Sequence, residues 1–229
     1  MSDVQVLLDR AAGATRRVCA DVRNAQLTWA HFEALRIETD PGAGLWSGAN
    51  YLDLGYPLDA LVVAVLRDTL AALMRATDDP RDKKLTLLRI RCALESGALR
   101  EERMAAAEKW KESSFPALRE KNSADCESSM QKIRDAVPTT WTDTSALKDQ
   151  RLAVHRKSLW PLRNSSLALA RPGDGNVATD DIRTFLKVVS ELTAHAELIF
   201  LEEANNWEAE RQRRLQEARA FWTQCQKGF

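Results

Sequence analysis

Apolar residues recur every three or four positions through most of this sequence, which is the spacing of one face of an α-helix. The stripe is clearest after Thr179, at Ile182, Phe185, Leu186, Val189, Leu192, Ala196, Ile199 and Leu201. A second helical pattern covers Asp3 to Ile37 and predicts one long helix, or two helices separated near Gly13. No stretch of any length alternates apolar and polar residues as a half-buried strand does. The pattern therefore predicts an all-α protein.

The most apolar stretch extends from Leu58 to Ala76, and Pro57 precedes it at a position where the first turn of a helix tolerates proline. A helix that is apolar on most faces is typical of the buried centre of a protein. The charged residues Arg67, Asp68 and Arg75 interrupt this background. They indicate either a core salt bridge or surface stripe, or a polar pocket.

Shorter and more polar elements fill the middle of the chain. Turn-forming residues from Glu38 to Gly48 must interrupt the first helical pattern. A short helix is predicted from Lys84 to Leu94, and a charged, exposed helical region extends from Ala98 to Ile133. Because proline lacks the amide hydrogen that a helix interior needs, we expect Pro116 to end or bend a helix in this region.

The C-terminal segment differs from the rest in its charge. After Asn205 and Asn206, the stretch from Trp207 to Lys227 is rich in charged residues. We predict that the helix beginning near Thr179 continues through this stretch for more than 40 residues. Its last part, residues 203–227, would be an arm that projects into solvent or packs on a partner.

Length and composition bound the class of protein. A chain of 229 residues fits one domain, spanning residues 1–229. Hydrophobic residues make up 45% and charged residues 29%, as in ordinary globular proteins. Lys+Arg and Asp+Glu both number 33, which argues against a strongly basic nucleic-acid surface over the whole protein while leaving local patches open.

Neither a signal peptide nor a membrane span is evident in the sequence. The residues Met1 to Gln5 lack a basic start followed by a long apolar run. The longest apolar run, Ala60 to Leu66, is too short to cross a bilayer. We therefore expect a cytoplasmic protein with no membrane partner.

The four cysteines, Cys19, Cys92, Cys126 and Cys225, are widely scattered and form no CxxC pair or Cys/His cluster. This spacing is typical of thiols in a reducing compartment and predicts neither a disulfide framework nor a structural zinc site. No P-loop, GxGxxG, HExxH or Gly-x-Ser-x-Gly sequence occurs. We expect no cofactor and no metal.

One short segment carries a family resemblance. Leu162-Arg163-Asn164-Ser165-Ser166-Leu167-Ala168-Leu169 precedes a Pro/Gly/Asp-rich loop and an acidic helix start. It resembles the signature helix of the HEPN superfamily (higher eukaryotes and prokaryotes nucleotide-binding), especially its abortive-infection branch. Members carry an arginine, a polar residue and then a histidine four to six positions after the arginine. Ala168 and Leu169 stand where that histidine would be, so the motif here is degenerate.

A second segment resembles the same branch. An apolar helix containing Leu66 ends in Asp78-Asp79-Pro80 and leads to Leu85-Thr86-Leu87-Leu88. The resemblance implies an up-and-down helical bundle, with long N- and C-terminal helices and a HEPN-like core over roughly residues 56–201. It also implies a homodimer that brings two signature helices together, with an RNA or nucleotide phosphate near Arg163 and Asn164.

Metal-independent cleavage of RNA needs groups that move protons to and from the reacting oxygens, and positive charge on the transition state. The resemblance implies that Arg163 stabilises the phosphate and that Asn164 orients it. His155 lies eight residues before Arg163, roughly two helical turns, and could replace the missing histidine as proton carrier. For His31 and His195, which lie on or beside apolar stripes, packing is the expected role. We expect loss of catalysis rather than its retention.

Two functional hypotheses follow. The first is a HEPN-like protein of phage-defence, abortive-infection or toxin–antitoxin type, related to metal-independent endoribonucleases and binding RNA or a nucleotide phosphate through Arg163, Asn164 and His155. The second is a non-enzymatic helical module for protein interaction or regulation, which acts through dimerisation and its C-terminal helix. Cleavage of RNA that depends on Arg163 would separate the two.

Overall fold

A computed structural model describes residues 2–38, 49–77, 85–110, 116–138 and 179–227 of the chain. All regular structure in these ranges is helical, which confirms the all-α prediction. The helices are α1 (Asp3–Glu38), α2 (Ala49–Thr77), α3 (Leu87–Ala93), α4 (Gly97–Ala107), α5 (Pro116–Ala136), α7 (Thr179–Leu201) and α8 (Trp207–Lys227).

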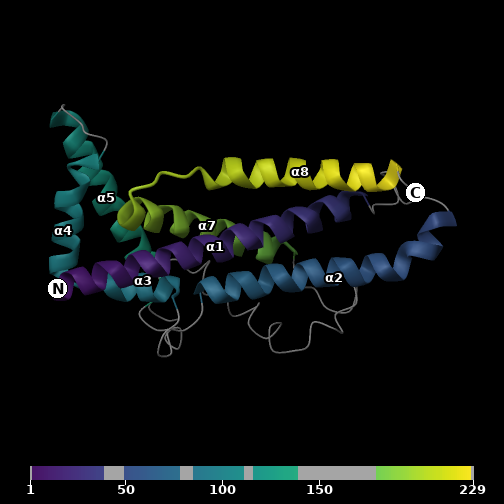
Figure 1. Cartoon of the computed structure of the whole chain (residues 1–229), viewed down its shortest axis with the longest axis horizontal. Coiled ribbons are helices and arrows are strands. Elements are labelled where there is room, and N and C mark those ends of the chain that lie inside the picture. The colour runs from purple at the N-terminus through teal and green to yellow at the C-terminus, as the bar shows by residue number, and fades with distance from the viewer. Residues whose placement is uncertain (1, 39–48, 78–84, 111–115, 139–178, 228–229) are drawn as a thin grey trace.

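The central element is α1, which passes through Gly13 without a break, so the single-helix alternative is the one observed. It contacts α2, α3, α4, α7 and α8, and Figure 1 shows it running along the middle of the molecule. Its buried positions recur at helical spacing and include Ala11, Ala14, Val18, Val22, Ala25, Trp29 and Phe32. α1 is therefore the surface on which the other long helices assemble.

The neighbouring helix α2 returns antiparallel to α1 (Figure 1). It begins at Ala49, so Pro57 lies inside the helix and the prediction of a start at Leu58 was wrong. Of the α2 side chains whose burial is described, most from Thr69 to Thr77 are buried, whereas Arg67 and Asp68 are exposed, so the predicted burial on most faces holds only in part of this range. Arg75 is bound to Asp21 of α1, with Nε 2.8 Å from Oδ1.

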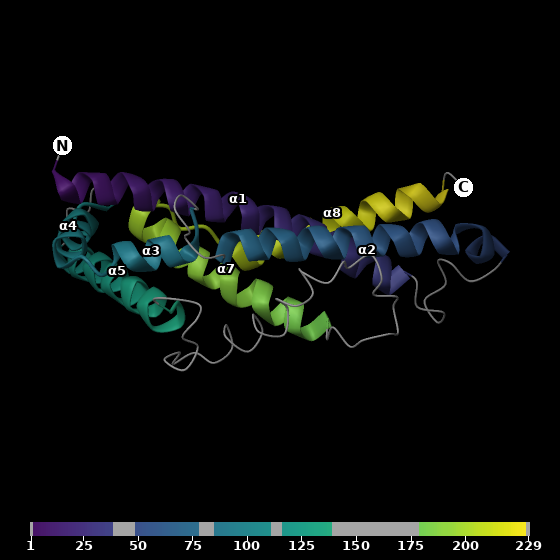
Figure 2. The same cartoon turned by 90° about the horizontal axis from the view of Figure 1, so that it is seen from below.

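Helices α4 and α5 pack against each other at the end of the bundle where α1 begins (Figure 2). The Ser96 hydroxyl accepts a hydrogen bond from the Leu99 amide and so caps α4. α4 ends at Ala107, and Pro116 is the first residue of α5. The prediction that Pro116 ends or bends a helix was wrong, because a proline at the first helical position loses no hydrogen bond.

Helices α7 and α8 are separate, so the prediction of one helix of more than 40 residues was wrong. The backbone of Glu202, just after α7, has φ 58°, a left-handed conformation that ends a helix. The chain then reverses, and α8 lies alongside α1 (Figure 1). The C-terminal segment therefore packs on its own chain, where Ala218 contacts Ala30 and Ala34 with help from Leu215 and Trp222.

The main core lies between α1, α2, α7 and the shorter helices. Its largest fully buried side chains are Trp29, Phe185, Leu35, Leu70, Leu73, Met74, Leu87, Leu88, Ile90, Leu94, Leu99 and Ile133. The apolar stripe predicted on α7 is buried here as expected, from Ile182 to Ile199. Within the described ranges, none of the helices has both the length and the apolar character needed to cross a membrane.

Candidate functional site

The residues assigned from the family resemblance cannot be placed in this fold. Arg163, Asn164 and His155 all lie outside the described residues, as does the whole segment from Leu162 to Leu169. Their roles in phosphate binding and proton transfer stay predictions.

The other two histidines make structural hydrogen bonds. Nδ1 of His31 accepts a hydrogen bond from Nε1 of Trp222, 3.2 Å away, and its ring lies edge-on to those of Phe221 and Trp222. Nδ1 of His195 lies 3.1 Å from the Ser129 hydroxyl, which ties α7 to α5. Burial lowers the pKa of both rings, so the neutral form is favoured.

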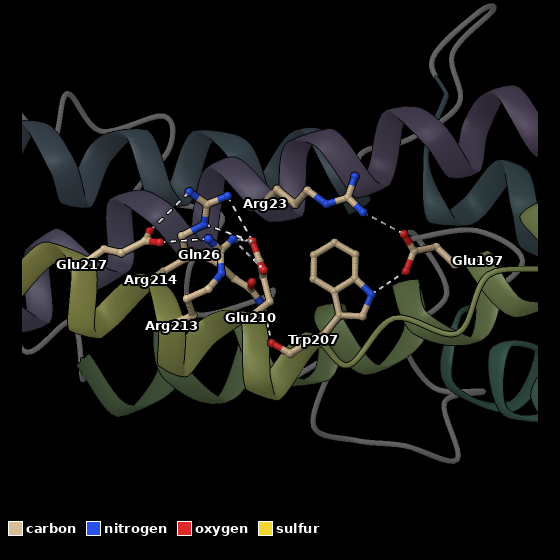
Figure 3. A network of polar contacts seen from close by, with 8 residues as sticks. All are labelled: Arg23, Gln26, Glu197, Trp207, Glu210, Arg213, Arg214 and Glu217. Atoms are coloured by element: carbon tan, nitrogen blue, oxygen red, sulfur yellow. Dashed lines mark hydrogen bonds and ion pairs between the residues drawn. The ribbon is translucent and has the colours of Figure 1, made fainter.

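A buried carboxylate stands at the junction of α7 and α8. Glu197 is fully buried, and burying a charge is costly unless it is paired and hydrogen-bonded. Its Oε1 lies 3.2 Å from Nη2 of Arg23 and 3.1 Å from Nδ2 of Asn205. Its Oε2 accepts a bond of 2.6 Å from Nε1 of Trp207 (Figure 3). Three donors from α1, the connection and α8 thus converge on one group of α7.

The first residue of α8 is held from several sides. The ring of Trp207 is buried, with the Arg23 guanidinium 5.2 Å from its centroid. Nε2 of Gln26 donates to the Trp207 carbonyl at 3.3 Å and to the Ser190 hydroxyl at 3.1 Å. The Asn206 side chain accepts a hydrogen bond from the Ala209 amide and caps α8. The start of α8 is therefore fixed to both α1 and α7.

The Cys19 thiol is part of the same junction but is not a nucleophile. It is buried, and burial together with the nearby Glu197 carboxylate raises its pKa well above the usual range. Burial likewise raises the pKa of Cys126 to about 11. The thiolate is the reactive form of cysteine, so both groups are inert at neutral pH.

Charged side chains on α8 pair mainly with one another. Arg213 bonds Glu210 at 2.9 Å and Glu217 at 2.8 Å, and Arg214 bonds Glu210 at 3.0 Å (Figure 3). Hydrogen bonds from Arg211 lower the pKa of Glu208 to about 2. Pairs at this spacing each add a few tenths of a kcal/mol to the stability of a helix.

A cavity of about 820 Å³ adjoins the junction, between α1, α7 and the start of α8. This volume falls within the range of small-molecule pockets, roughly 300–1,000 Å³. The residues that line it include Gln26, Trp29, Leu186, Leu198, Trp207 and Arg211.

Sequence reasoning missed this junction, because Glu197 and Gln26 were not considered as site residues. Glu197 lies on the buried side of α7, four positions after Thr193, but the pattern alone does not single it out because a charged residue in a helix is most often exposed. Among the described residues, no group of three or more His, Cys, Asp and Glu side chains could hold a metal ion. Comparison with known proteins finds no match to this chain among family models, curated proteins or solved structures.

Proposed function

We propose that this chain is a non-enzymatic helical interaction module that forms a homodimer through α8. One observation carries the proposal: α8 is anchored to the bundle at Trp207, whereas near its far end Phe221 keeps 50% of its surface exposed. Among the described residues, only Leu85 is another large apolar side chain exposed to a comparable degree. The ring of Phe221 lies beside those of His31 and Trp222, so this part of α8 carries an aromatic cluster, and aromatic residues are enriched at protein interfaces.

The polar chemistry of the described residues supports a binding role over a catalytic one. His31 and His195 are engaged with Trp222 and Ser129, and the Glu197 carboxylate is surrounded by donors. A general acid or base must reach the proton that it transfers. These groups instead hold helices together.

The charge pattern of α8 suits pairing with a second copy. Its exposed side chains carry both signs and include Arg213, Glu217 and Arg219. In an isologous dimer, a residue of one copy meets its complement on the other. Because Arg213 is already paired with Glu210 and Glu217 within its own helix, two antiparallel α8 helices would meet around Phe221 without net charge repulsion.

Size-exclusion chromatography with light scattering tests this proposal. The wild-type chain should elute with twice its monomer mass, and Phe221→Asp should reduce it to a monomer, because a charge would be buried at the centre of the interface. The matched control is Leu85→Asp, which changes an exposed apolar residue away from α8. A wild-type chain that stays monomeric at the highest attainable concentration would overturn the proposal.

A second candidate function rests on the sequence from Leu162 to Leu169. In this proposal, the chain is a HEPN-like protein of phage-defence or toxin–antitoxin type that acts in the cytoplasm. Arg163 and Asn164 would bind an RNA or nucleotide phosphate, and His155 would carry the proton if any catalysis remained. The support is the resemblance of the motif, together with the all-α fold.

An RNA assay separates the two candidates. Labelled RNA is incubated with the wild type, with Arg163→Ala, and with Arg219→Ala as a control for an exposed arginine on α8. Cleavage that disappears only in Arg163→Ala would establish an enzyme and rule out the module. Absence of both cleavage and RNA binding would rule out the HEPN-like function.

A further inference from the structure

We propose that His31 makes the dimer sensitive to pH, because a proton gained by its ring loosens the end of α8 that carries Phe221 and weakens the binding of the second copy. The inference rests on the dimerisation through α8 proposed above and names a device that regulates it. The device is the contact between His31 of α1 and the adjacent aromatic residues Phe221 and Trp222 of α8.

The end of α8 is held to α1 by few side chains. Between positions 219 and 225, Trp222 and Cys225 are partly buried and the other side chains are exposed. Trp222 packs on the small apolar cluster around Ala218, and its Nε1 donates a hydrogen bond to Nδ1 of His31, 3.2 Å away. Among the described residues, this is the one hydrogen bond that joins this end of α8 to α1.

The direction of this hydrogen bond fixes the protonation state of His31. An indole N–H can only donate, so Nδ1 of His31 must accept. It can do so only in the neutral ring whose proton is on Nε2, because the charged ring carries an N–H group at both nitrogens. Protonation would therefore place two donors 3.2 Å apart, and the bond would be lost.

The surroundings of His31 favour its neutral form. Burial, rather than a neighbouring charge, lowers its pKa, so the ring titrates below the usual value of about 6.5. The described charged side chains on the helices around the contact are exposed or paired with one another. They are Glu33 on α1, Arg67 and Asp68 on α2, Arg183 on α7, and Arg214, Glu217 and Arg219 on α8.

The loss of this bond reaches the dimer through Phe221. Its ring is nearly perpendicular to that of Trp222, with centroids 5.0 Å apart, and to that of His31, at 5.9 Å. A side chain that is already held in place loses less freedom on association than a mobile one. We expect the dissociation constant of the dimer to rise about fivefold, as for the loss of roughly one hydrogen bond. The rise begins as the pH falls below about 6.5.

The first readout does not depend on the dimer. NMR spectra of the indole N–H groups of the full chain are recorded between about pH 8 and about pH 5, where histidine titrates. Trp222→Phe identifies the Trp222 signal by its absence. This signal should titrate in the wild type and stay still in His31→Gln, whose amide oxygen accepts without titrating. The matched control is His195→Gln, because His195 bonds Ser129 rather than α8, and it should titrate as the wild type does.

The second readout is the dissociation constant of the dimer, measured by analytical ultracentrifugation at about pH 7.5 and about pH 5.5. The wild type and His195→Gln should dimerise about fivefold more weakly at the lower pH, whereas His31→Gln should keep its affinity. A Trp222 signal that does not titrate, or an affinity that falls equally in His31→Gln, would overturn this inference and leave the dimer standing. A chain that is monomeric at both pH values would overturn the proposed function, and with it this regulation.

Discussion

Helices α7 and α8 both pack against α1, yet they are held in different ways. The buried face of α7 is a continuous apolar stripe that includes Ile182, Phe185, Leu186, Val189, Leu192, Ala196 and Ile199. On α8 the buried side chains are Trp207 at the first position and Ala218 near the middle of the helix. One helix is therefore held by apolar area along its length, and the other by a polar anchor at its first residue and a small apolar contact at Ala218.

This difference predicts that the two helices have different local stabilities. Regions with few buried apolar contacts open at lower free energy than the core. α8 should therefore separate from α1 while α7 stays in place, provided that the Glu197 junction is the main attachment. The following experiments break or sharpen this comparison, beginning with the largest effect.

Shortening a core residue of α7 should have the largest effect. Phe185→Ala removes a fully buried ring and should lower the free energy of unfolding by about 3–5 kcal/mol, as measured by urea denaturation. The control on α8 is Arg219→Ala, which should change it by less than about 0.5 kcal/mol because that side chain is exposed. Similar losses in both variants would contradict the comparison.

Neutralising the anchor should loosen α8 selectively. Glu197→Gln weakens the bonds to Arg23 and Trp207, and should cost about 2 kcal/mol because hydrogen bonds to a charged group are among the stronger ones. Hydrogen exchange of the α8 amides should accelerate more than that of α1 and α7. The control is Glu191→Gln, an exposed residue of the same helix. Uniform acceleration across all helices would show that α8 is not a separate unit.

Substitutions at Glu202, in the turn between α7 and α8, should have a smaller effect on stability, and glycine should be the more stable replacement there. Glu202 has φ 58° and pairs with Arg103 at 2.7 Å. Glu202→Gly and Glu202→Ala both lose this pair, but only glycine tolerates the left-handed backbone without strain. The glycine variant should be about 1 kcal/mol more stable than the alanine variant in thermal or urea denaturation. Equal stabilities would mean that the backbone there is unstrained.

The smallest expected effect is the pH dependence of stability that arises from His31, which contacts Phe221 and Trp222 of α8. Burial lowers the pKa of His31, so the unfolded chain holds that proton more tightly than the folded one does. The stabilisation is complete above the unfolded pKa, about 6.5, and is lost as pH falls towards the lower folded value. His31→Gln can still accept from Trp222 without titrating. Its melting temperature should therefore fall less than that of the wild type on acidification.

The apolar pattern was sufficient to predict the fold class and the buried face of α7, because those depend on side-chain burial with a helical period. Element boundaries were harder. Nothing in the composition around Glu202 indicates a helix stop, since neither glycine nor proline is present there. The predicted turn region ends at Gly48, but the helix was predicted only from Leu58 because proline is favoured at a first helical turn, whereas α2 begins at Ala49 with Pro57 inside it.

The junction was not predictable from the pattern, because its polar residues act through partners distant in sequence. Glu197 is stabilised by Arg23 of α1, and Gln26 by Ser190 and the Trp207 carbonyl. A charged residue in a helix is most often exposed, so the sequence favoured a solvated position. The residues taken from the family resemblance, Arg163, Asn164 and His155, lie outside the described ranges and stay untested.

The burial of Cys19 against Glu197 has a practical consequence. A maleimide should alkylate the exposed Cys92 first, and the buried Cys19 should react later, when α8 separates from α1 and uncovers the junction. The difference between the labelling rates of Cys92 and Cys19 therefore reports how often that separation occurs. Mass spectrometry can measure it without an added probe.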